Sequence, residues 1–520
     1  MNRKIKYSLL VSVVLFLGCK DFLEPKSQSE YVPRVVQSLD ELLLGDAYHS
    51  PVQITSNMLY STLGLFDDDV AARPDMTIVD ESENDFNKAL LAFSWSKDMF
   101  TKLSGFGNAY ASSYRLIMGC NAVLDYLDDV AGTIEEKNDV KAQALALRSF
   151  YYFHLVNLYG KPYSVDKKAP GVPLKLTSRL STDAMPRSTV ERIYDQITGD
   201  LREAERLIKT LPDEKQLRKN KRVNLPFIQL LLSRVYLYME NWEDAMRYAE
   251  TVINNYDYMI KDLNTVKEPD RNSNLSYPNY YDWNNSEVIF MLGDLNDIIS
   301  LAITSVTAVV TEGTETFKKS TVVCVASDDL INSYDPNDLR KTRYLVWESI
   351  TSKQSGPKYR IPVSKLKVGT DYNFNTGWGN DWGIAFKITE AYLNAAEAAA
   401  MVYKTEGDAV CQTKALQWLD KLREKRYPTG TYIELTVAKV GDLVEFVRAE
   451  RRRELCFEHH RWFDLRRYGM EKLKHVWYDR NHNPIEYVLE KNDPGFTLML
   501  PASAFENNPA LEQNDIQGEL

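Results

Sequence analysis

Three consecutive aspartates, Asp67, Asp68 and Asp69, lie in a stretch of the chain without regular periodicity. Carboxylates so close together could hold a calcium ion. They could also supply the acid and the partner carboxylate that a glycoside hydrolase places about 5 to 9.5 Å apart across a bound sugar. A run of like charges in a loop is more commonly a solvated surface. We therefore expect a solvated acidic loop here, without a metal ion.

A second group that could do chemistry is the run Glu458-His459-His460, with Asp464 shortly after it. The sequence lacks the HExxH spacing, and adjacent histidines on a helix point about 100° apart, so both cannot easily face one ion. The surrounding block carries charges of both signs one helical turn apart. This pattern predicts a buried ion-pair network that includes Glu450, Glu454, Arg448, Arg451, Arg452 and Arg453.

Aromatic side chains in loop-like sequence favour ligand binding over catalysis. The chain contains 31 Tyr and 9 Trp, of which many must pack the core. Sugar rings expose apolar C–H faces, and Trp and Tyr offer flat apolar platforms with a polar edge. A single such ring is more commonly a packing residue than a ligand contact. The candidate ligand contacts, richest around residues 280–285, are Trp95, Tyr280, Tyr281, Trp283, Trp378 and Trp382.

Several functional classes lack their usual signals in this sequence. It contains no G-x-S-x-G elbow, no P-loop and no Rossmann glycine fingerprint, and its cysteines form no CxxC pair. The net charge of −10 opposes nucleic-acid binding, because that binding depends on Lys and Arg neutralising phosphates. We expect no cofactor and no metal. A neutral ligand such as a sugar or a peptide fits this composition better.

The N-terminus has the pattern of an exported lipoprotein. A basic start precedes an apolar run over residues 9–17 that is too short to cross about 30 Å of hydrocarbon. The run ends in Leu-Phe-Leu-Gly-Cys19, which resembles a lipobox, although Phe16 stands where Leu is usual. We predict a signal peptide over residues 1–18 and acyl chains on Cys19, each buried methylene contributing about 0.8 kcal/mol to membrane attachment.

Helical periodicity dominates residues 108–255 and 384–468. Within the first region, residues 233–253 predict a helix, a tight turn at Glu240-Asn241 and a second helix, with Ala245 and Ala249 small enough for close approach. This unit resembles a tetratricopeptide pair, and such pairs stack to bury a shared core. We expect about four pairs, the later helices lying at 384–403, 408–426 and 442–468.

Two other regions, residues 48–106 and 256–383, are irregular. The second is rich in Asn, Asp, Ser, Tyr and Gly and contains short β-like runs at 288–290 and 321–325. Long irregular segments on a helical scaffold are where binding loops are found. We therefore expect the ligand to bind these two regions.

Segments spread in order along almost the whole chain resemble the SusD/RagB family of nutrient-uptake lipoproteins. The most specific are ALALRSFYYFHLVNLYGKPY at 144–163 and RAERRRELCFEHHRWFDLRRYG at 448–469. Two departures are Lys387, where Arg is frequent, and Asp515, where the family has Pro-Gly. The other matching segments are 19–23, 171–174, 187–201, 286–290, 333–340, 389–398 and 500–514.

The resemblance implies a mostly α-helical fold in which tetratricopeptide-like pairs carry a loop-rich lobe with short strands, all within one domain over residues 19–520. It also implies a lipid-anchored protein on the cell surface, in the outer membrane. Such a protein captures a glycan and passes it to a SusC-like TonB-dependent barrel, and separate hydrolases carry out catalysis. The ligand residues vary within the family, so none is carried over to this chain.

Three alternatives remain open from the sequence. A peptide-binding, RagB-type member of the same family would contact backbone amides in a groove instead of stacking on sugar rings. A surface glycosidase would turn its substrate over and release reducing ends. A tetratricopeptide adaptor that only assembles proteins would still support growth on a glycan after Trp283→Ala.

Overall fold

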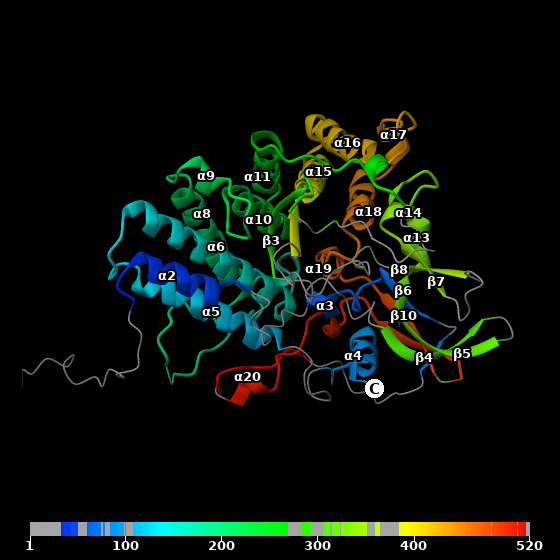
Figure 1. Ribbon diagram of the computed structural model, residues 1–520, viewed down its shortest axis with the longest axis horizontal. Helices are drawn as coiled ribbons and strands as arrows, with labels where there is room; N and C mark the ends of the chain where they lie inside the picture. The colour runs from blue at the N-terminus through cyan, green and yellow to red at the C-terminus, as the bar shows by residue number, and fades with distance from the viewer. Residues whose placement is uncertain are drawn as a thin grey trace, which may run out of the picture.

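The computed structural model of the chain is a row of packed helices that carries a lobe of short strands at one end (Figure 1). It describes residues 33–49, 60–73, 76–78, 84–97, 99, 108–181, 183–268, 280, 283–293, 305–312, 315–322, 324–350, 359–363, 384–479, 481–506 and 508–515. The predicted signal peptide and Cys19 lie outside these residues.

The row begins with helices α5 (Ala109–Tyr126), α6 (Ile134–Tyr159) and α8 (Val190–Ile208). A capping box at Thr133 starts α6, because its hydroxyl accepts from the Glu136 N–H and the Glu136 carboxylate accepts from the Thr133 N–H. Helices α6 and α8 are joined by a buried bidentate ion pair, with Arg148 Nε 2.8 Å from Asp200 Oδ2. The family-like segment 144–163 is therefore scaffold.

Helices α10 (Leu225–Tyr238) and α11 (Trp242–Asn255) form the predicted tetratricopeptide-like pair. Glu240 has a φ of 58°, and this left-handed residue reverses the chain between the helices. Asn241 then caps α11, its side chain accepting from the Asp244 N–H. The hydroxyl of Ser233 donates to Ala245 O at 2.9 Å, so the two helices are in close contact, as their small residues predict.

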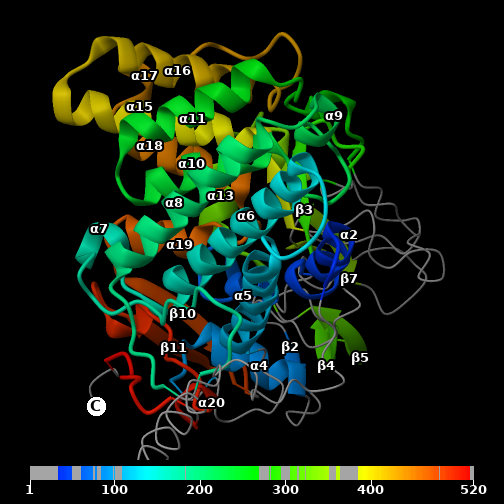
Figure 2. The ribbon, with the colours of Figure 1, turned by 90° about the vertical axis from the view of Figure 1, so that its left-hand side faces the viewer.

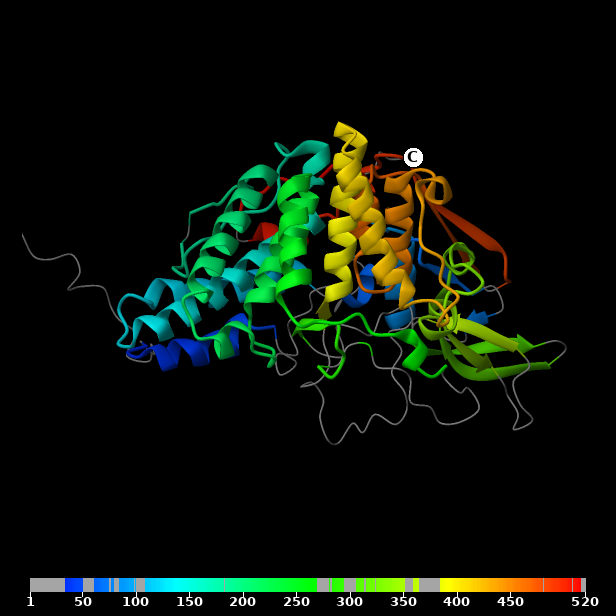
Figure 3. The same ribbon diagram turned by 90° about the horizontal axis from the view of Figure 1, so that it is seen from above.

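The row continues across the long irregular insertion. Helix α11 packs directly on α15 (Ile388–Glu406), although residues 256–387 separate them in sequence (Figure 3). Helix α15 then packs on α16 (Ala409–Glu424) and α18 (Leu443–Leu455). Six alanines of α15 are fully buried and allow this close packing: Ala391, Ala395, Ala396, Ala398, Ala399 and Ala400.

The single helix expected over residues 442–468 is wrong. The structure has α18, a turn, and a separate helix α19 (Arg461–Arg467). Phe457 and His459 in that turn have φ angles of 65° and 66°, which no α-helix accommodates. Helix α8 is capped by Thr189, whose side chain accepts from the Arg192 N–H.

Short antiparallel strands form the lobe below the helices (Figure 2). The β-like run at 288–290 lies in β3 (Val288–Leu292), and the described residues of the run at 321–325 lie in two further strands, β5 (Glu315–Val322) and β6 (Cys324–Ala326). The mostly helical fold with short strands is confirmed. The pairs are β1 (Val70–Ala72) with β6, β3 with β9 (Ile384–Lys387), β7 (Val346–Ile350) with β8 (Tyr359–Val363), and β10 (Leu473–Tyr478) with β11 (Pro484–Leu489); β4 (Ser305–Glu312) pairs with both β2 (Met76–Ile78) and β5.

Short helices connect these layers. They are α2 (Val36–Leu42), η2 (Leu43–Ala47), α3 (Tyr60–Leu63), α4 (Asn84–Phe93), α7 (Tyr163–Asp166), α9 (Asp213–Gln216), η3 (Leu263–Thr265), α13 (Asp328–Ser333), α14 (Arg340–Arg343), α17 (Val437–Val440), η5 (Pro494–Phe496) and α20 (Ser503–Glu506). Among the described residues, no helix combines the length and the apolar character that crossing a bilayer requires. Cys120, Cys324, Cys411 and Cys456 are buried free thiols.

Candidate functional site

An open cleft with about 500 Å³ of empty volume lies between the end of α4 and the segment around η5. Trp95 lines it, together with residues that carry hydroxyl, ammonium and carboxylate groups. Such a mixture can contact an apolar ring face and hydrogen-bond its substituents. The described lining residues are Trp95, Ser96, Lys97, Met99, Pro494, Gly495, Thr497, Leu498, Met499 and Asp515.

Trp95 reaches the cleft through an unusual helix end. The N–H groups of Trp95 and Ser96 donate to Ala92 O and Leu91 O, which is the Schellman pattern at the end of α4. The position that Trp95 occupies there is normally glycine, because its φ of 51° is left-handed. A bulky residue at this position is strained, and such strain concentrates at functional sites. The indole N–H compensates by donating to Phe66 O at 2.9 Å.

His475 of β10 lies behind Trp95, between two aromatic rings. Its ring centroid is 4.1 Å from that of Trp95, with a 23° angle between the planes, and 4.2 Å from that of Phe93, with a 25° angle. Its Nδ1 is 2.7 Å from Phe93 O and its Nε2 is 3.0 Å from Asp67 O. Trp95 is only 8% exposed, so this stack fixes the ring and leaves a small part of it in the cleft.

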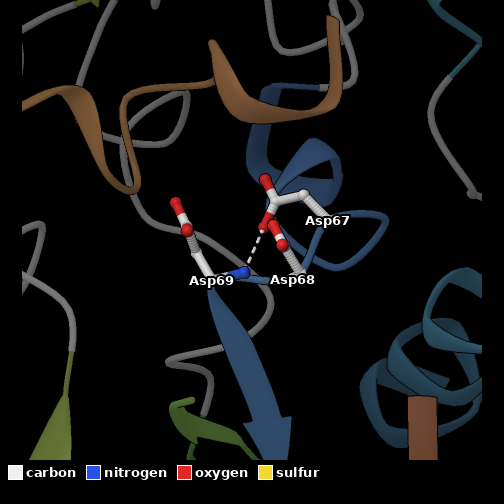
Figure 4. Close-up of side chains that lie close together, drawn as sticks. All are labelled: Asp67, Asp68 and Asp69. Carbon is white, nitrogen blue, oxygen red and sulfur yellow. Dashed lines mark hydrogen bonds between the residues drawn. The ribbon is translucent and has the colours of Figure 1, made fainter. Parts of the chain in front are cut away.

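The expectation of a solvated acidic loop at Asp67, Asp68 and Asp69 is wrong. Asp67 and Asp69 are buried, and the Asp69 N–H donates to Asp67 Oδ1 at 3.0 Å (Figure 4). Arg461 makes a bidentate pair with Asp68, at 2.7 and 2.8 Å, and Arg452 Nε lies 2.8 Å from Asp69 Oδ1. The triplet is therefore a buried anchor for the end of α18 and the start of α19.

The same contacts test whether the triplet fits a cation. Among the described residues, only these three aspartates place three acidic, His or Cys ligand atoms within 4.8 Å of one another. Two guanidinium groups already occupy Asp68 and Asp69, and their charge opposes a metal ion. Burial, together with the charges of Asp69 and Asp68, also raises the pKa of Asp67 well above its usual range. The residues do not fit a metal site.

Asp68 predicts a pH dependence of stability. Burial alone would raise its pKa, but the hydrogen bonds and charge of Arg461, with the charge of Arg452, lower the pKa to about 2. Because the pKa of Asp68 is lower in the folded than in the unfolded protein, its ionised carboxylate stabilises the fold above about pH 4. This stabilisation is lost as the pH falls through the pKa of the folded state. We expect Asp68→Asn to lower the free energy of unfolding by about 1–2 kcal/mol at neutral pH and by little near pH 2.

Urea denaturation at a series of pH values measures this difference. Asp129→Asn, at an exposed turn after α5, is the control and should leave the curve unchanged. A constant difference between wild type and Asp68→Asn across the whole range would show that the pair does not titrate as described.

The predicted buried ion-pair network in the block 448–467 is confirmed for Glu450, Glu454, Arg451, Arg452 and Arg453, but its principal partners were missed. Including Arg448 was wrong, because Arg448 pairs with the exposed Glu445 at the surface. Glu454 is fully buried and accepts from Arg340 Nη1 at 3.0 Å and from Arg426 Nη2 at 2.7 Å. Neither arginine lies in the block. Glu450 pairs with Arg340 at 2.6 Å, so these contacts join the lobe to the row of helices. Further members are Asp338, Glu287, Arg423 and Arg453.

His459 and His460 lie in the turn between α18 and α19, so the helical geometry assumed for them does not apply. Both are buried and line a cavity of mixed polarity, and Tyr60 contacts His459 with ring centroids 5.3 Å apart. Burial, followed by the charges of Arg234 and Arg451, lowers the pKa of His460 well below its usual value. His460 is therefore neutral and packs this interior.

The structure separates the predicted ligand aromatics. Trp95 lines the cleft, whereas Tyr280 is 2% exposed and its hydroxyl donates to Arg343 O at 3.1 Å, against α14. Trp283 is partly buried and packs on the main core. The ring of Tyr280 is a packing residue here, and ligand contact by Trp283 stays a prediction. The candidates Tyr281, Trp378 and Trp382 lie outside the described residues.

Sequence reasoning missed most of the cleft. Lys97 stands two residues after Trp95 and could have been proposed from proximity alone. Thr497 and Asp515 come from the far end of the chain, and no local signal marks them. His475 was missed because a lone histidine in a strand says nothing about which rings will cover it.

The row of helix pairs that carries a lobe of short strands defines a protein of tetratricopeptide-like architecture, with a cleft lined by Trp95. A family model described as "Starch-binding associating with outer membrane" matches residues 21–237, and one described as "SusD family" matches residues 308–516. The chain belongs to the SusD family. The resemblance inferred from the sequence is confirmed.

Individual relatives agree with this assignment. The chain is 23% identical to SusD-like protein P25 of Formosa agariphila, over 98% of both chains. A SusD-like carbohydrate binding protein from Bacteroides vulgatus has the same fold, with a TM-score of 0.64, 21% identity, and coverage of 92% of this chain and 97% of that one. Surface glycan-binding protein A from Bacteroides thetaiotaomicron, solved with laminarihexaose, gives a TM-score of 0.62 at 18% identity, covering 92% of this chain and 99% of that one.

Proposed function

We propose that this protein binds a glycan in the cleft lined by Trp95 and passes it to a SusC-like TonB-dependent barrel. The observation that carries the proposal is a strained tryptophan held rigidly at the wall of an open, mixed-polarity cleft in a SusD-family fold. A relative of the same fold holds laminarihexaose, which supports a sugar as the ligand class.

The lining suits binding without bond breaking. Trp95 and Leu498 can contact the apolar face of a sugar ring, while Lys97, Thr497 and Asp515 can hydrogen-bond its hydroxyls. Hydrolysis would need two carboxyl groups on either side of the scissile bond. Asp515 is the only carboxylate among the described lining residues. We therefore propose a binding protein that is not an enzyme.

The proposal includes attachment to the outer membrane and one mature domain over residues 19–520. Acylation of Cys19 after removal of residues 1–18 would tether the protein, and more than one acyl chain makes such attachment stable. The description of one matching family model, which places its members at the outer membrane, supports this location. The helix pairs near 108–255 and 384–468 would then hold the loop-rich regions 48–106 and 256–383 towards the ligand.

Replacement of Trp95 tests the cleft. We expect Trp95→Ala to weaken binding about tenfold or more, because buried tryptophans at binding sites commonly contribute about 2 kcal/mol or more. A glycan array with a soluble form that begins after Cys19 identifies ligands, laminarihexaose among them. Isothermal titration calorimetry then measures the affinity of each variant.

The control for this measurement is Trp418→Ala. Trp418 lies in α16, remote from the described cleft residues, and is 7% exposed against 8% for Trp95, so both variants lose similar packing. It should lower stability and leave glycan affinity unchanged. Equal affinity in wild type and a folded Trp95→Ala variant would contradict the cleft as the binding site.

The same soluble protein also distinguishes glycan binding from the three alternative functions. Released reducing ends after incubation with the bound glycan would establish a glycosidase. Binding to a peptide library and to no glycan would place the protein in the peptide-binding RagB-type branch. Binding of neither, together with undiminished growth on glycans after Trp283→Ala, would favour an assembly adaptor.

A further inference from the structure

The ring of His475 faces two oxygen atoms that can only accept hydrogen bonds. Its Nδ1 is 2.7 Å from the carbonyl oxygen of Phe93, and its Nε2 is 3.0 Å from the carbonyl oxygen of Asp67. A neutral imidazole has one N–H and one lone pair, so it can satisfy only one of these carbonyls. Both carbonyls are satisfied only when each nitrogen carries a hydrogen, which is the imidazolium form.

The rings on either side favour the same form. His475 is stacked between Trp95 and Phe93, at centroid distances of 4.1 and 4.2 Å. A cation over the face of an aromatic ring is attracted by the ring quadrupole, most strongly for tryptophan. Loss of the proton removes this attraction and turns a lone pair towards one of the two carbonyls. The stack that fixes Trp95 is therefore tighter when His475 is charged.

We propose that His475 is a positioning residue whose doubly protonated ring holds Trp95 at the wall of the cleft, so that the protein binds glycan more tightly in mildly acidic than in alkaline medium. This inference rests on the proposed function of the cleft. His475 acts on the cleft through its stack with Trp95, so its effect on the ligand is indirect.

The charges around His475 come from few elements. The segment before β1 provides Asp67 and Asp68, and the charge of Asp68 raises the pKa of His475. Arg452 and Arg461 neutralise this segment. Strand β11 places Tyr487 opposite His475, while β1 and the end of α4 contribute only uncharged side chains. Burial is the largest influence and lowers the pKa of His475, so the imidazolium forms below the usual range.

The direction of the pH effect follows from the thermodynamic linkage between proton binding at His475 and glycan binding. If the protonated stack binds glycan better, binding takes up a proton, and affinity rises as the pH falls through the His475 pKa. We expect the dissociation constant for laminarihexaose to fall roughly threefold to tenfold between about pH 8 and about pH 5, which corresponds to a pKa rise of up to about one unit on binding. Calorimetry in two buffers of different ionisation enthalpy measures the proton uptake directly.

His475→Phe is the decisive variant, because it keeps a ring between Trp95 and Phe93 and removes both N–H groups. A role in packing alone predicts wild-type affinity and an unchanged pH profile. Our proposal predicts weaker binding at about pH 5 and loss of the pH dependence. His154→Phe is the control, a buried histidine that lines the interior cavity and should leave the profile unchanged.

Two measurements on the ligand-free protein test the role of His475 independently of whether the cleft binds a glycan. Nitrogen-15 spectra of the histidines report whether both nitrogens of His475 carry hydrogen, with His475→Phe identifying the signal. The emission of Trp95, obtained by subtracting the Trp95→Phe spectrum, should change with the same titration.

A singly protonated His475 in acidic solution, or a pH-independent glycan affinity, would overturn the proposal and leave glycan binding intact. Failure to bind any glycan while both signals titrate together would instead remove the proposed function and retain the role of His475.

Discussion

Glu454→Gln is expected to lower the free energy of unfolding by about 3–5 kcal/mol, the usual cost of removing one partner from a buried ion pair. Glu454 is fully buried, with Arg340 and Arg426 on its two oxygens and the Tyr344 hydroxyl 3.1 Å from Oε1. Glutamine keeps the shape but leaves the two buried guanidinium groups with one carboxylate fewer. The denaturant midpoint of the soluble form measures the loss.

Glu424→Gln provides the matched control. Glu424 lies on α16 with its side chain 62% exposed, and its nearest cation is 4.0 Å away, so its removal should change stability by less than about 0.5 kcal/mol. Because Arg340 belongs to the lobe and Glu454 to the row of helices, Glu454→Gln should also loosen the lobe. Faster amide exchange around α14 in the variant would show this. Similar midpoints for both variants would mean that the buried centre contributes little to stability.

Cys19→Ala is expected to abolish acylation of the protein, because this cysteine is the proposed site of the lipid anchor. Metabolic labelling with a radioactive fatty acid in the native host should mark the wild-type protein and leave the variant unlabelled. Fatty-acid incorporation is the decisive readout, since binding to a barrel could retain unacylated protein in the membrane fraction.

The control for this experiment is Cys411→Ser, a buried thiol of α16 that should be labelled like the wild type. Digestion of intact cells with a protease then tests exposure on the surface. Purification of a tagged wild-type protein from the outer membrane should bring a TonB-dependent barrel with it, identified by mass spectrometry. Label on Cys19→Ala would contradict the predicted lipobox.

Local signals predicted the helices well. The pair α10–α11 follows from periodicity and from two small residues, Ala245 and Ala249, because a helix turn depends on neighbours only three or four positions away. The break between α18 and α19 was missed, because the left-handed residues there, Phe457 and His459, are not glycines. The sequence therefore contains no residue that marks the turn.

The acidic triplet shows why the candidate site was harder to predict. Composition alone predicts that Asp67, Asp68 and Asp69 are solvated, yet Arg461 reaches Asp68 from 393 residues further along the chain. The partners of Glu454 are equally remote: Arg340 lies 114 residues away. Burial of a charge depends on such long-range pairs, and a single sequence does not state them.

The amino-acid sequence by itself determined the helical pairs, the lobe with short strands, the lipoprotein-like start and the family. All of these depend on patterns within a few tens of residues or on their order along the chain. Only the tertiary structure decided that α11 meets α15, that Trp95 lines a cleft with Thr497, and that His475 lies behind it. These contacts join residues more than a hundred positions apart, and packing of the whole chain is the physical cause that selects them.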